Sequence, residues 1–552
     1  MSERPTFPER FNLADYYVFD RLTEGLGPKI AVRFGDRAYS YDDIADRTRL
    51  VRAHFALAGV PREARVLIAL RDSPAFVWAF FATLHHGAVV AMGNPDAPAE
   101  DLEYLLDYTG AEALVTCPRV AAALAEPIAR SARLRTVLVV PEDDTGHDVE
   151  APLTLPDVRG AVGLRDALAA ARRADVAGPS PTARDELAIW LFTSGSTGRS
   201  KAAMHTHRDF AFNTEVYAKR TVGYARDDVT VSVPRLFFGY ATGTNLMFPF
   251  AVGATTALFS ERPTPESLAW AIATYRPTVV TNVPTMMGKL LEHDRDLVKA
   301  GQAPLDFSCV RFHLSAGEAL PQALMERFTE RFGAEVYDGI GSAEMFHIYA
   351  SNRPGDIKPG SLGRVVAGYE IAVLPSDAST PGAAPLPPGE TGVLWVRGDS
   401  IALGYHRDRD RSWATFHGAW CRTGDLFRID ADGYLWFSGR ADDLLKVGGV
   451  WVAPVEVEEC LLKHASVAAA AVIGVLEDGL TKPMAFVVLR SHADACDELA
   501  TTLKEHVKAR LSKHKYPRTI AFVVDLPKND RGKVDRKRLE SLAATATGPK
   551  VS

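Results

Sequence analysis

The chain has few cysteines, no excess of positive charge and no apolar run that could cross a membrane without interruption. Its five cysteines in 552 residues form no CxxC pair and have no nearby histidine at metal-ligand spacing. This pattern indicates a reduced, cytosolic compartment rather than a disulfide framework or a zinc site. Lys and Arg number 63 against 69 Asp and Glu, a net charge of −6, so a nucleic-acid binder is disfavoured.

Two uncharged windows are long enough to span a bilayer, but both contain helix breakers. Ser73–Pro95 is typical of a helix capped by Ser73 and followed, after a histidine pair and a glycine, by a strand over 88–92. Leu236–Ser260 is interrupted by three glycines and a proline. The N-terminal sequence MSERPTFPER lacks the apolar region of a secretory signal. We therefore expect a soluble, cytoplasmic protein without a membrane partner.

The organisation of residues 28–140 predicts an α/β fold. Short apolar strands such as Val66–Leu70 and Ala113–Thr116 alternate with helical segments. Leu187–Phe192 is a continuous apolar run, typical of a strand buried on both faces of a largely parallel sheet. At 47% hydrophobic and 24% charged residues, the composition is that of an ordinary globular protein.

Beyond residue 440 the pattern changes to a smaller α+β domain. We expect a helix with Pro454 in its first turn, strands at 467–475 and 485–489, a helix at 494–513 and a strand at 519–524. The domains are therefore predicted at 1–440 and 441–552. The tail from Ala543 shows no apolar period, which predicts a frayed end.

A loop rich in serine, threonine and glycine follows the predicted buried strand. Thr193–Lys201 reads TSGSTGRSK, and its backbone amides, hydroxyls and ammonium can face the oxygens of a polyphosphate. The spacing is not that of a Walker A loop. The alternative is a flexible connection that ends in a solvated lysine.

Three later motifs carry groups that suit a nucleotide. Tyr337–Glu344, YDGIGSAE, offers a carboxylate for Mg²⁺ after a glycine-rich bend. Arg422–Asp425 and Gly439–Asp443 add an acid suited to a ribose diol and an arginine suited to a sugar or phosphate. Each motif alone is weak, since such turns and ion pairs are common on protein surfaces. Their order along the chain is the stronger signal.

In that order, the chain resembles the adenylate-forming superfamily of acyl-CoA synthetases, luciferases and peptide-synthetase adenylation domains. The matching segments are LFTSGSTGRSK, FFGY, SAGEAL, YDGIGSAE, RTGD, GRADDLLKVGG and PKNDRGKVDR. MHTH, LFFGYATG, GIGSAEMFHIY and SNRPGDIKPGSLGR are most similar to benzoate-CoA ligase and its aminobenzoate and hydroxybenzoate relatives. The resemblance implies a large α/β domain with parallel-rich sheets and a smaller, mobile α+β domain, with ATP, Mg²⁺ and coenzyme A.

The resemblance also assigns roles to individual residues. Glu344 would bind Mg²⁺, Lys533 would act in adenylation, Asp425 would bind the ribose hydroxyls, and Arg440 the ribose or α-phosphate region. The wider ATP and AMP site would comprise Thr193, Ser194, Gly195, Ser196, Thr197, Gly198 and Lys201 at the phosphates, with Gly317, Glu318, Ala319 and Asp338 at the adenine, followed by Gly339, Ile340, Gly341, Ser342 and Ala343.

The remaining roles concern the two other substrates. Asp442 would be the hinge of the small domain, and Gly448 and Gly449 would line a tunnel for the thiol of coenzyme A, where only glycine lets the backbone approach closely. The aryl pocket would be formed by Phe238, Tyr240, Ala241, Gly339, Gly341 and His347. The two aromatic residues are alternatively core residues, and His347 either contacts the substrate or packs behind it.

Two positions differ from the superfamily pattern. Ala343 stands where a threonine usually precedes the magnesium-binding glutamate, so one hydroxyl near the α-phosphate is missing. Ile340 stands where many relatives stack an aromatic ring on adenine, and the benzoate-ligase branch also has an aliphatic residue there. His205 and His207 lack a third ligand nearby, and we expect a polar helix start there rather than a metal site.

The implied reaction has two steps. An aromatic carboxylate attacks the α-phosphorus of ATP, releasing pyrophosphate, and a thiol then attacks the acyl adenylate and releases AMP. Coenzyme A is the expected acceptor, whereas a carrier-protein phosphopantetheine is the alternative, and a homodimer remains open. A non-catalytic nucleotide-binding scaffold is disfavoured because the catalytic positions are occupied, and a phosphotransferase because kinase motifs are missing.

Overall fold

A computed structural model of the 552-residue chain describes residues 4–142, 148–179, 181–194, 199–447, 450–477, 480–491, 495–527 and 534–546. The chain divides into two compact units, one of residues 1–371 with 396–421 and one of residues 372–395 with 422–552. The domain boundary predicted at 440 and 441 stays a prediction. No helix in the described ranges combines the length and hydropathy that a bilayer span requires.

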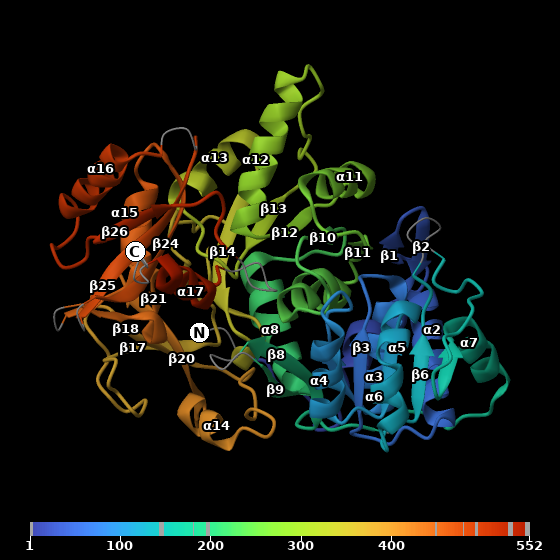
Figure 1. The fold of residues 1–552 in the computed structure, drawn as a ribbon. Coiled ribbons are helices and arrows are strands. Elements are labelled where there is room, and N and C mark those ends of the chain that lie inside the picture. Colours follow the sequence, from blue (N-terminus) through green and yellow to red (C-terminus); the bar gives the residue numbers. More distant parts are fainter. Residues whose placement is uncertain are drawn as a thin grey trace. The chain divides into compact units, whose positions relative to one another are not determined.

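The first sheet of the larger unit is parallel except at one edge (Figure 1). Its order is β7-β6-β5-β3-β4-β8-β9, and only β9 runs antiparallel to its neighbour. The strands are β3 (Arg65–Ala69), β4 (Val89–Met92), β5 (Ala113–Thr116), β6 (Thr136–Val139), β7 (Ala161–Gly163), β8 (Leu187–Ser194) and β9 (Ser200–Thr206). Its helices are α2 (Tyr41–Leu57), α3 (Pro74–His86), α4 (Ala99–Thr109), α5 (Pro118–Ala123), α6 (Ala125–Arg130) and α7 (Leu164–Arg173).

The first uncharged window is a buried helix and strand, as predicted. Ser73 caps α3 by accepting a hydrogen bond from the Phe76 amide, Pro74 occupies the first turn, and Gly87 ends the helix with φ of +74°. Every residue of β4 is buried. The window therefore contributes apolar layers to an α/β core.

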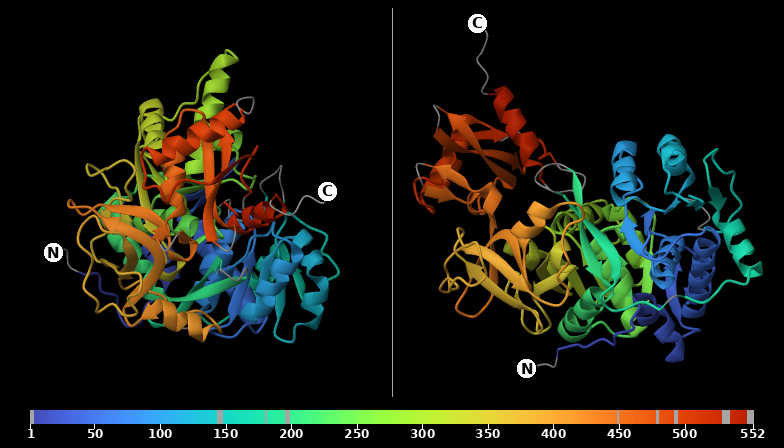
Figure 2. Two further views of the ribbon diagram at one scale, coloured as in Figure 1. Left: turned by 60° about the vertical axis from the view of Figure 1, so that its left-hand side comes forward. Right: turned by 90° about the horizontal axis from the view of Figure 1, so that it is seen from below.

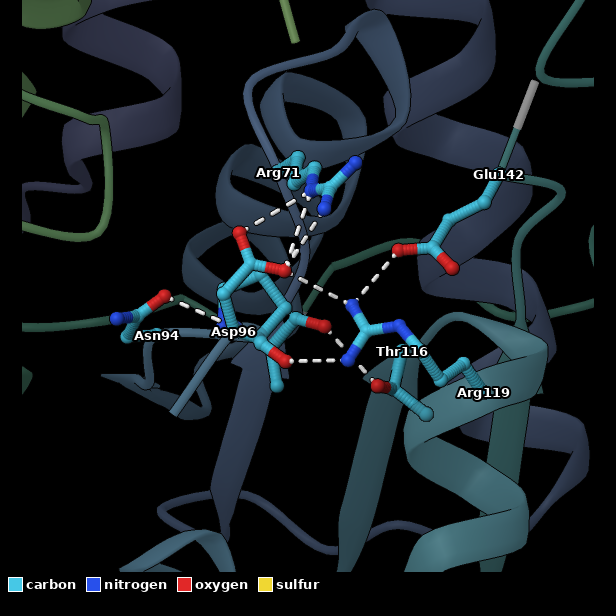
Figure 3. A network of polar contacts seen from close by, with 8 residues as sticks. Arg71, Asn94, Asp96, Thr116, Arg119 and Glu142 are labelled. Atoms are coloured by element: carbon cyan, nitrogen blue, oxygen red, sulfur yellow. Dashed lines mark hydrogen bonds and ion pairs between the residues drawn. The ribbon is translucent and has the colours of Figure 1, made fainter. Parts of the chain in front are cut away.

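Ion pairs connect the carboxyl ends of this parallel sheet (Figure 3). Asp96 pairs with Arg71 at 2.9 Å and with Arg119 at 3.0 Å, and Arg119 also reaches Glu142 at 3.0 Å. These residues follow β3, β4, β5 and β6. In open α/β sheets ligands bind at such edges, but here the two guanidinium groups are already matched by carboxylates.

The second sheet of the larger unit has nine strands, and β10 to β14 lie side by side within it (Figure 1). Its order is β16-β15-β14-β13-β12-β10-β11-β1-β2, with β10 to β14 and β1 parallel to their neighbours and β2, β15 and β16 antiparallel. The strands are β1 (Ile30–Phe34), β2 (Arg37–Ser40), β10 (Val229–Ser232), β11 (Thr255–Leu258), β12 (Val279–Asn282), β13 (Phe312–Ser315), β14 (Glu335–Gly341), β15 (Ile348–Ser351) and β16 (Arg364–Val365).

The remaining helical segments of the larger unit are of several kinds. The α-helices are α1 (Asp20–Thr23), α8 (His207–Asn213), α9 (Gly239–Thr242), α10 (Phe248–Val252), α11 (Pro265–Tyr275), α12 (Pro284–Lys299), α13 (Gln322–Phe332) and α14 (Arg409–Thr415). Three π-helices, η1 (Asp15–Phe19), η2 (Thr214–Val222) and η3 (Gly243–Met247), and a 3₁₀ turn, η4 (Ala343–Met345), complete the set. π-Helices are frequent at functional sites, and η3 follows the predicted aryl-pocket segment.

A five-stranded sheet has the order β17-β18-β20-β19, with β21 paired to β20, and the later strands form a two-stranded and a three-stranded sheet. Its strands are β17 (Glu370–Leu374), β18 (Gly392–Arg397), β19 (Phe416–His417), β20 (Trp420–Ile429) and β21 (Leu435–Arg440), and the later elements are η5 (Ala441–Asp443), β22 (Leu445–Val447), β23 (Val450–Val452), α15 (Pro454–Leu462), β24 (Val467–Glu477), β25 (Leu480–Leu489), α16 (Asp497–Lys508), β26 (Thr519–Phe522) and α17 (Arg536–Ala546).

The sheet β24-β25-β26 is covered on both faces (Figure 2). Val472 and Val487 pack with α15 and α16, whereas Ile473 and Phe486 pack with α17, as the two-residue alternation of strands requires. The prediction of a frayed tail from Ala543 is wrong at its start. Ala543 is 1% exposed within α17, because the apolar face of β24 and β25 requires a cover.

Candidate active site

The serine- and glycine-rich segment connects two strands of a hairpin. Thr193 on β8 lies opposite Lys201 on β9, and Ser194 lies opposite Ser200. The Lys201 ammonium lies 3.6 Å from the centre of the Tyr405 ring, a cation–π contact. The predicted phosphate-binding residues between the strands, Gly195, Ser196, Thr197 and Gly198, lie outside the described residues.

Tyr405 also contacts the predicted magnesium ligand. Its hydroxyl donates a hydrogen bond of 2.6 Å to Oε1 of Glu344. Burial and the neighbouring carboxylate raise the pKa of the Tyr405 hydroxyl, so it remains protonated and able to donate. The Glu344 carbonyl accepts a bond of 2.8 Å from the Ala402 amide. The structure thus joins Lys201 and Glu344, predicted from two separate motifs, through a tyrosine that sequence reasoning missed.

A strained turn separates Glu344 from the predicted aryl site. Phe346 has φ of +66° and ψ of −59°, a conformation that costs free energy in a non-glycine residue and occurs mainly at functional sites. Its buried ring lies against Phe210. The main chain therefore changes direction at Phe346, between Glu344 on η4 and His347 just before β15.

His347 is enclosed by aromatic rings. Its ring centre lies 5.3 Å from that of Tyr240 and 4.7 Å from that of Phe248, and its Nε2 lies 3.0 Å from the Tyr240 carbonyl oxygen. Burial lowers the pKa of His347 to about 4, so the neutral ring donates through Nε2. Nδ1 is buried and has no hydrogen-bond partner among the described residues. Of the predicted aryl-site residues, the structure thus brings Tyr240 and His347 together.

The predicted aryl-site glycines have a second role that the sequence did not indicate. A Cβ atom at Gly339 would lie 2.9 Å from the Ala350 carbonyl oxygen, and one at Gly341 would lie 2.5 Å from that of His347. Both glycines therefore permit the close approach of β14 and β15. Their predicted role as thin walls of an aryl slot stays a prediction, as do those of Ala241, which is buried in α9, and Phe238, which precedes that helix.

Two residues of the predicted adenine site are fixed in different ways: Glu318 by hydrogen bonds and Asp338 by burial. Gly317 has φ of +89°, and the next residue, Glu318, accepts hydrogen bonds from the amide and hydroxyl of Thr285 at 3.1 and 2.8 Å. These bonds fix the turn, which continues into Ala319, to the start of α12. Asp338 is only 3% exposed, and burial raises the pKa of its carboxyl well above the usual range.

In the smaller unit, two predicted nucleotide residues form an ion pair. Asp425 on β20 is the register partner of Arg440 on β21, and Oδ1 lies 3.2 Å from Nη1. The hairpin thus unites the RTGD and GRADD motifs. Asp442 lies in η5, whereas Gly448, Gly449 and Lys533 lie outside the described residues. Within the described residues, no three His, Cys, Asp or Glu side chains gather as a metal cluster.

Sequence comparison assigns the chain to a family. Residues 19–406 match the family described as AMP-binding enzyme, and residues 456–533 match its C-terminal domain. The chain belongs to the AMP-binding enzyme family. This membership confirms the predicted superfamily resemblance, and the mixed α/β fold with its parallel-rich sheets confirms the predicted fold class.

Aryl-CoA ligases are among the proteins to which this chain is similar. The benzoate–CoA ligase of Thauera aromatica is 37% identical over 536 residues, which are 97% of this chain and 96% of that protein. A crystal structure of an anthranilate CoA ligase with anthranoyl-AMP matches with a TM-score of 0.87 at 31% identity, over 98% of this chain and 99% of the other. A benzoate CoA ligase from Burkholderia xenovorans matches with 0.82 at 36% identity, over 96% and 100%.

Proposed function

We propose that the chain activates an aromatic carboxylic acid with ATP and transfers the aryl group to coenzyme A, releasing AMP and pyrophosphate. The acid is of the benzoate, aminobenzoate or hydroxybenzoate type. The observation that carries the proposal is the position of an uncharged His347 between the rings of Tyr240 and Phe248. The predicted magnesium ligand Glu344 lies three residues before this histidine, and Ala343 four residues before it. Similarity to aryl-CoA ligases along nearly the whole chain supports it.

The chemistry requires no nucleophile from the protein. The carboxylate oxygen of the acid bonds to the α-phosphorus while the bond to the pyrophosphate oxygen breaks, giving a mixed anhydride with a good leaving group. The thiolate of coenzyme A then attacks the acyl carbon, and AMP leaves. The protein positions two anions in line and neutralises the charge that develops, which Lys201 and Lys533 can do electrostatically. Asp425 and Arg440 would hold the ribose.

The residues present fit a magnesium ion delivered with ATP. Mg²⁺ uses one or two carboxylates and completes its shell with water and phosphate oxygens, so a single glutamate is enough. Tyr405 donates one hydrogen bond to Oε1 of Glu344, and the carboxylate has further lone pairs that could bind a cation. When bound, the ion would neutralise phosphate charge. Glu344 itself supplies a fixed oxygen ligand at the end of η4.

The proposal includes a moving C-terminal domain that begins at residue 441. With Asp442 as its hinge, one orientation would bring Lys533 to the α-phosphate, and the other would bring Gly448 and Gly449 to the thiol channel. We place the enzyme in the cytosol because its five cysteines are free thiols. A carrier-protein phosphopantetheine is the alternative acceptor.

The test is acid-dependent release of pyrophosphate across aryl and alkyl carboxylates, with and without coenzyme A. Benzoate-type acids should exceed acetate and octanoate by at least ~100-fold, a few kcal/mol of differential ring burial. AMP and aryl-CoA should form in equal amounts. Equal turnover of octanoate would refute the aryl specificity, ADP would refute adenylation, and thioester found only on a carrier protein would favour the alternative acceptor.

A further inference from the structure

The MHTH segment contains two buried histidines to which the proposed reaction gives no role. His207 starts α8, as predicted for this segment, and its Nδ1 accepts a hydrogen bond of 3.2 Å from the Leu13 amide. His205 instead lies on β9, and its side chain is fully buried. The two residues share a motif but have different surroundings.

Both ring nitrogens of His205 face hydrogen-bond acceptors. Nδ1 lies 3.0 Å from Oδ2 of Asp209, and Nε2 lies 2.6 Å from the carbonyl oxygen of Ala343, which is 138 residues away in sequence. Because a carbonyl oxygen can only accept, Nε2 of His205 donates to Ala343. The ring therefore connects α8 directly to η4.

Asp209 is itself held in place. It is 2% exposed, and it accepts from the Thr206 amide at 3.0 Å and from the Thr206 hydroxyl at 2.6 Å. The carboxylate therefore cannot turn away without losing bonds that also cap α8. As a consequence, the plane and direction of the His205 ring are set before any ligand binds.

The carbonyl that His205 binds belongs to the residue directly before Glu344. The Glu344 carbonyl is held by Ala402 and its Oε1 by Tyr405. His205 thus provides a third hydrogen bond to this short turn. Its partner is the carbonyl of the peptide group that joins Ala343 to Glu344. The side chain of Ala343 itself supplies no hydroxyl for this purpose.

We propose that His205, oriented by Asp209, is a positioning residue that fixes the main chain at Ala343 and thereby the carboxylate of Glu344. This inference rests on the proposed function, in which Glu344 binds the Mg²⁺ that accompanies ATP. Residues that orient a metal ligand without touching the metal typically change metal affinity or activity by ~10- to 100-fold when they are replaced.

The experiment compares His205→Leu, His205→Gln and the matched control His207→Leu. We expect His205→Leu to raise the Mg²⁺ concentration for half-maximal adenylation by ~10- to 100-fold, while aryl-CoA formation from supplied aryl adenylate changes little. His205→Gln retains an amide donor and should recover most of the loss. His207→Leu should lower the melting temperature without changing the Mg²⁺ requirement.

A binding measurement separates this inference from the proposed function. Calorimetric titration with ATP, in Mg²⁺ and in EDTA, gives the gain in affinity due to the metal without any turnover. His205→Leu should lose most of that gain. The wild type could show this gain in ATP affinity although none of the aryl acids tested causes pyrophosphate release. The proposed aryl function would then be wrong, but loss of the gain in His205→Leu would still support the positioning role.

Three results would overturn this inference alone. They are an unchanged Mg²⁺ requirement in a folded His205→Leu protein, an equal shift in His207→Leu, and equal loss of both half-reactions. Absence of any metal-dependent gain in the wild type would overturn both proposals. Should His205→Leu not fold, Asp209→Asn, which weakens the contact that orients the His205 ring, must raise the Mg²⁺ requirement, and the inference is wrong if it does not.

Discussion

Tyr405 serves two candidate catalytic groups with different parts of one side chain. Its ring lies beneath the ammonium of Lys201, and its hydroxyl donates to Glu344. A phenylalanine would keep the first contact and lose the second. The two contributions can therefore be measured separately.

We expect Tyr405→Phe to slow acid-dependent pyrophosphate exchange by at least ~10-fold, because a hydrogen bond to a charged group is worth ~1.5 to 3 kcal/mol. Tyr405→Leu also removes the cation–π contact, worth ~0.5 to 2 kcal/mol, and should be slower still. Exchange rates at saturating ATP and acid provide the comparison. Equal rates for the Tyr405→Phe variant and the wild-type enzyme would show that the hydroxyl does not support Glu344.

The absence of a side chain at Gly243 permits the orientation of the His347 ring. A Cβ atom there would lie 2.5 Å from Cδ2 and 2.6 Å from Nε2 of His347, so Gly243→Ala must turn the ring and break its bond to Tyr240. We expect KM for the aryl acid to rise by ~10-fold, the value of one buried hydrogen bond, with KM for ATP unchanged. Gly288→Ala, where a Cβ meets nothing within 4 Å, is the control. A change in the KM for ATP alone would remove His347 from the aryl pocket.

At the scale of elements, β13 carries a histidine into the middle of the second sheet. His313 is fully buried, and neither of its ring nitrogens has a hydrogen-bond partner among the described residues. Burial lowers its pKa to about 3. The folded state thus binds fewer protons than the unfolded state, in which the pKa is about 6.5, and stability is lost as the pH falls from about 6.5 toward 3.

His313→Leu should abolish this contribution. Relative to the wild type, the variant should gain about 1.4 kcal/mol of unfolding free energy for each pH unit below about 6.5, so that the gain at pH 4.5 exceeds that at pH 7.5 by about 2 to 3 kcal/mol. Urea unfolding at the two pH values measures the difference. If both proteins lose stability equally on acidification, His313 does not titrate as argued.

Sequence patterns predicted elements whose signals are local. Ser73 and Pro74 marked the start of α3, and the apolar run from Leu187 marked β8, because caps and buried strands depend on adjacent residues. α17 was missed since Leu539 and Ala543, one helical turn apart, are too few to establish a period, and their burial depends on distant strands. For the same reason the contact between His205 and Ala343 left no sequence signal. The site motifs were found through resemblance, which gave residues but not their connection through Tyr405.

At the scale of the whole molecule, Lys533 tests the alternation of domains. Removing one preorganised charge from a developing oxyanion costs a factor of ~10² to 10³, so Lys533→Ala should slow aryl-adenylate formation by that much. Formation of aryl-CoA from supplied adenylate should change little, because the lysine would then have moved away. Single-turnover assays of each half-reaction measure both effects.

Asp442→Pro is the complementary variant for the same assays. A fixed φ at the hinge should preserve adenylation and impair transfer to coenzyme A. Equal impairment of both steps by Lys533→Ala, or of neither, would refute the alternation as proposed here.

The larger unit is assembled from two stretches of chain, residues 1–371 and 396–421, with part of the smaller unit between them. Tyr405 and Ala402, which hold Glu344, lie in the second stretch. A ribosome releases the chain from its N-terminus, so Glu344 emerges about sixty residues before its tyrosine. Both sheets of the larger unit are synthesised before Tyr405 emerges, but the turn that carries the carboxylate must wait for the returning segment. Completion of this half of the site is thus tied to the order of translation.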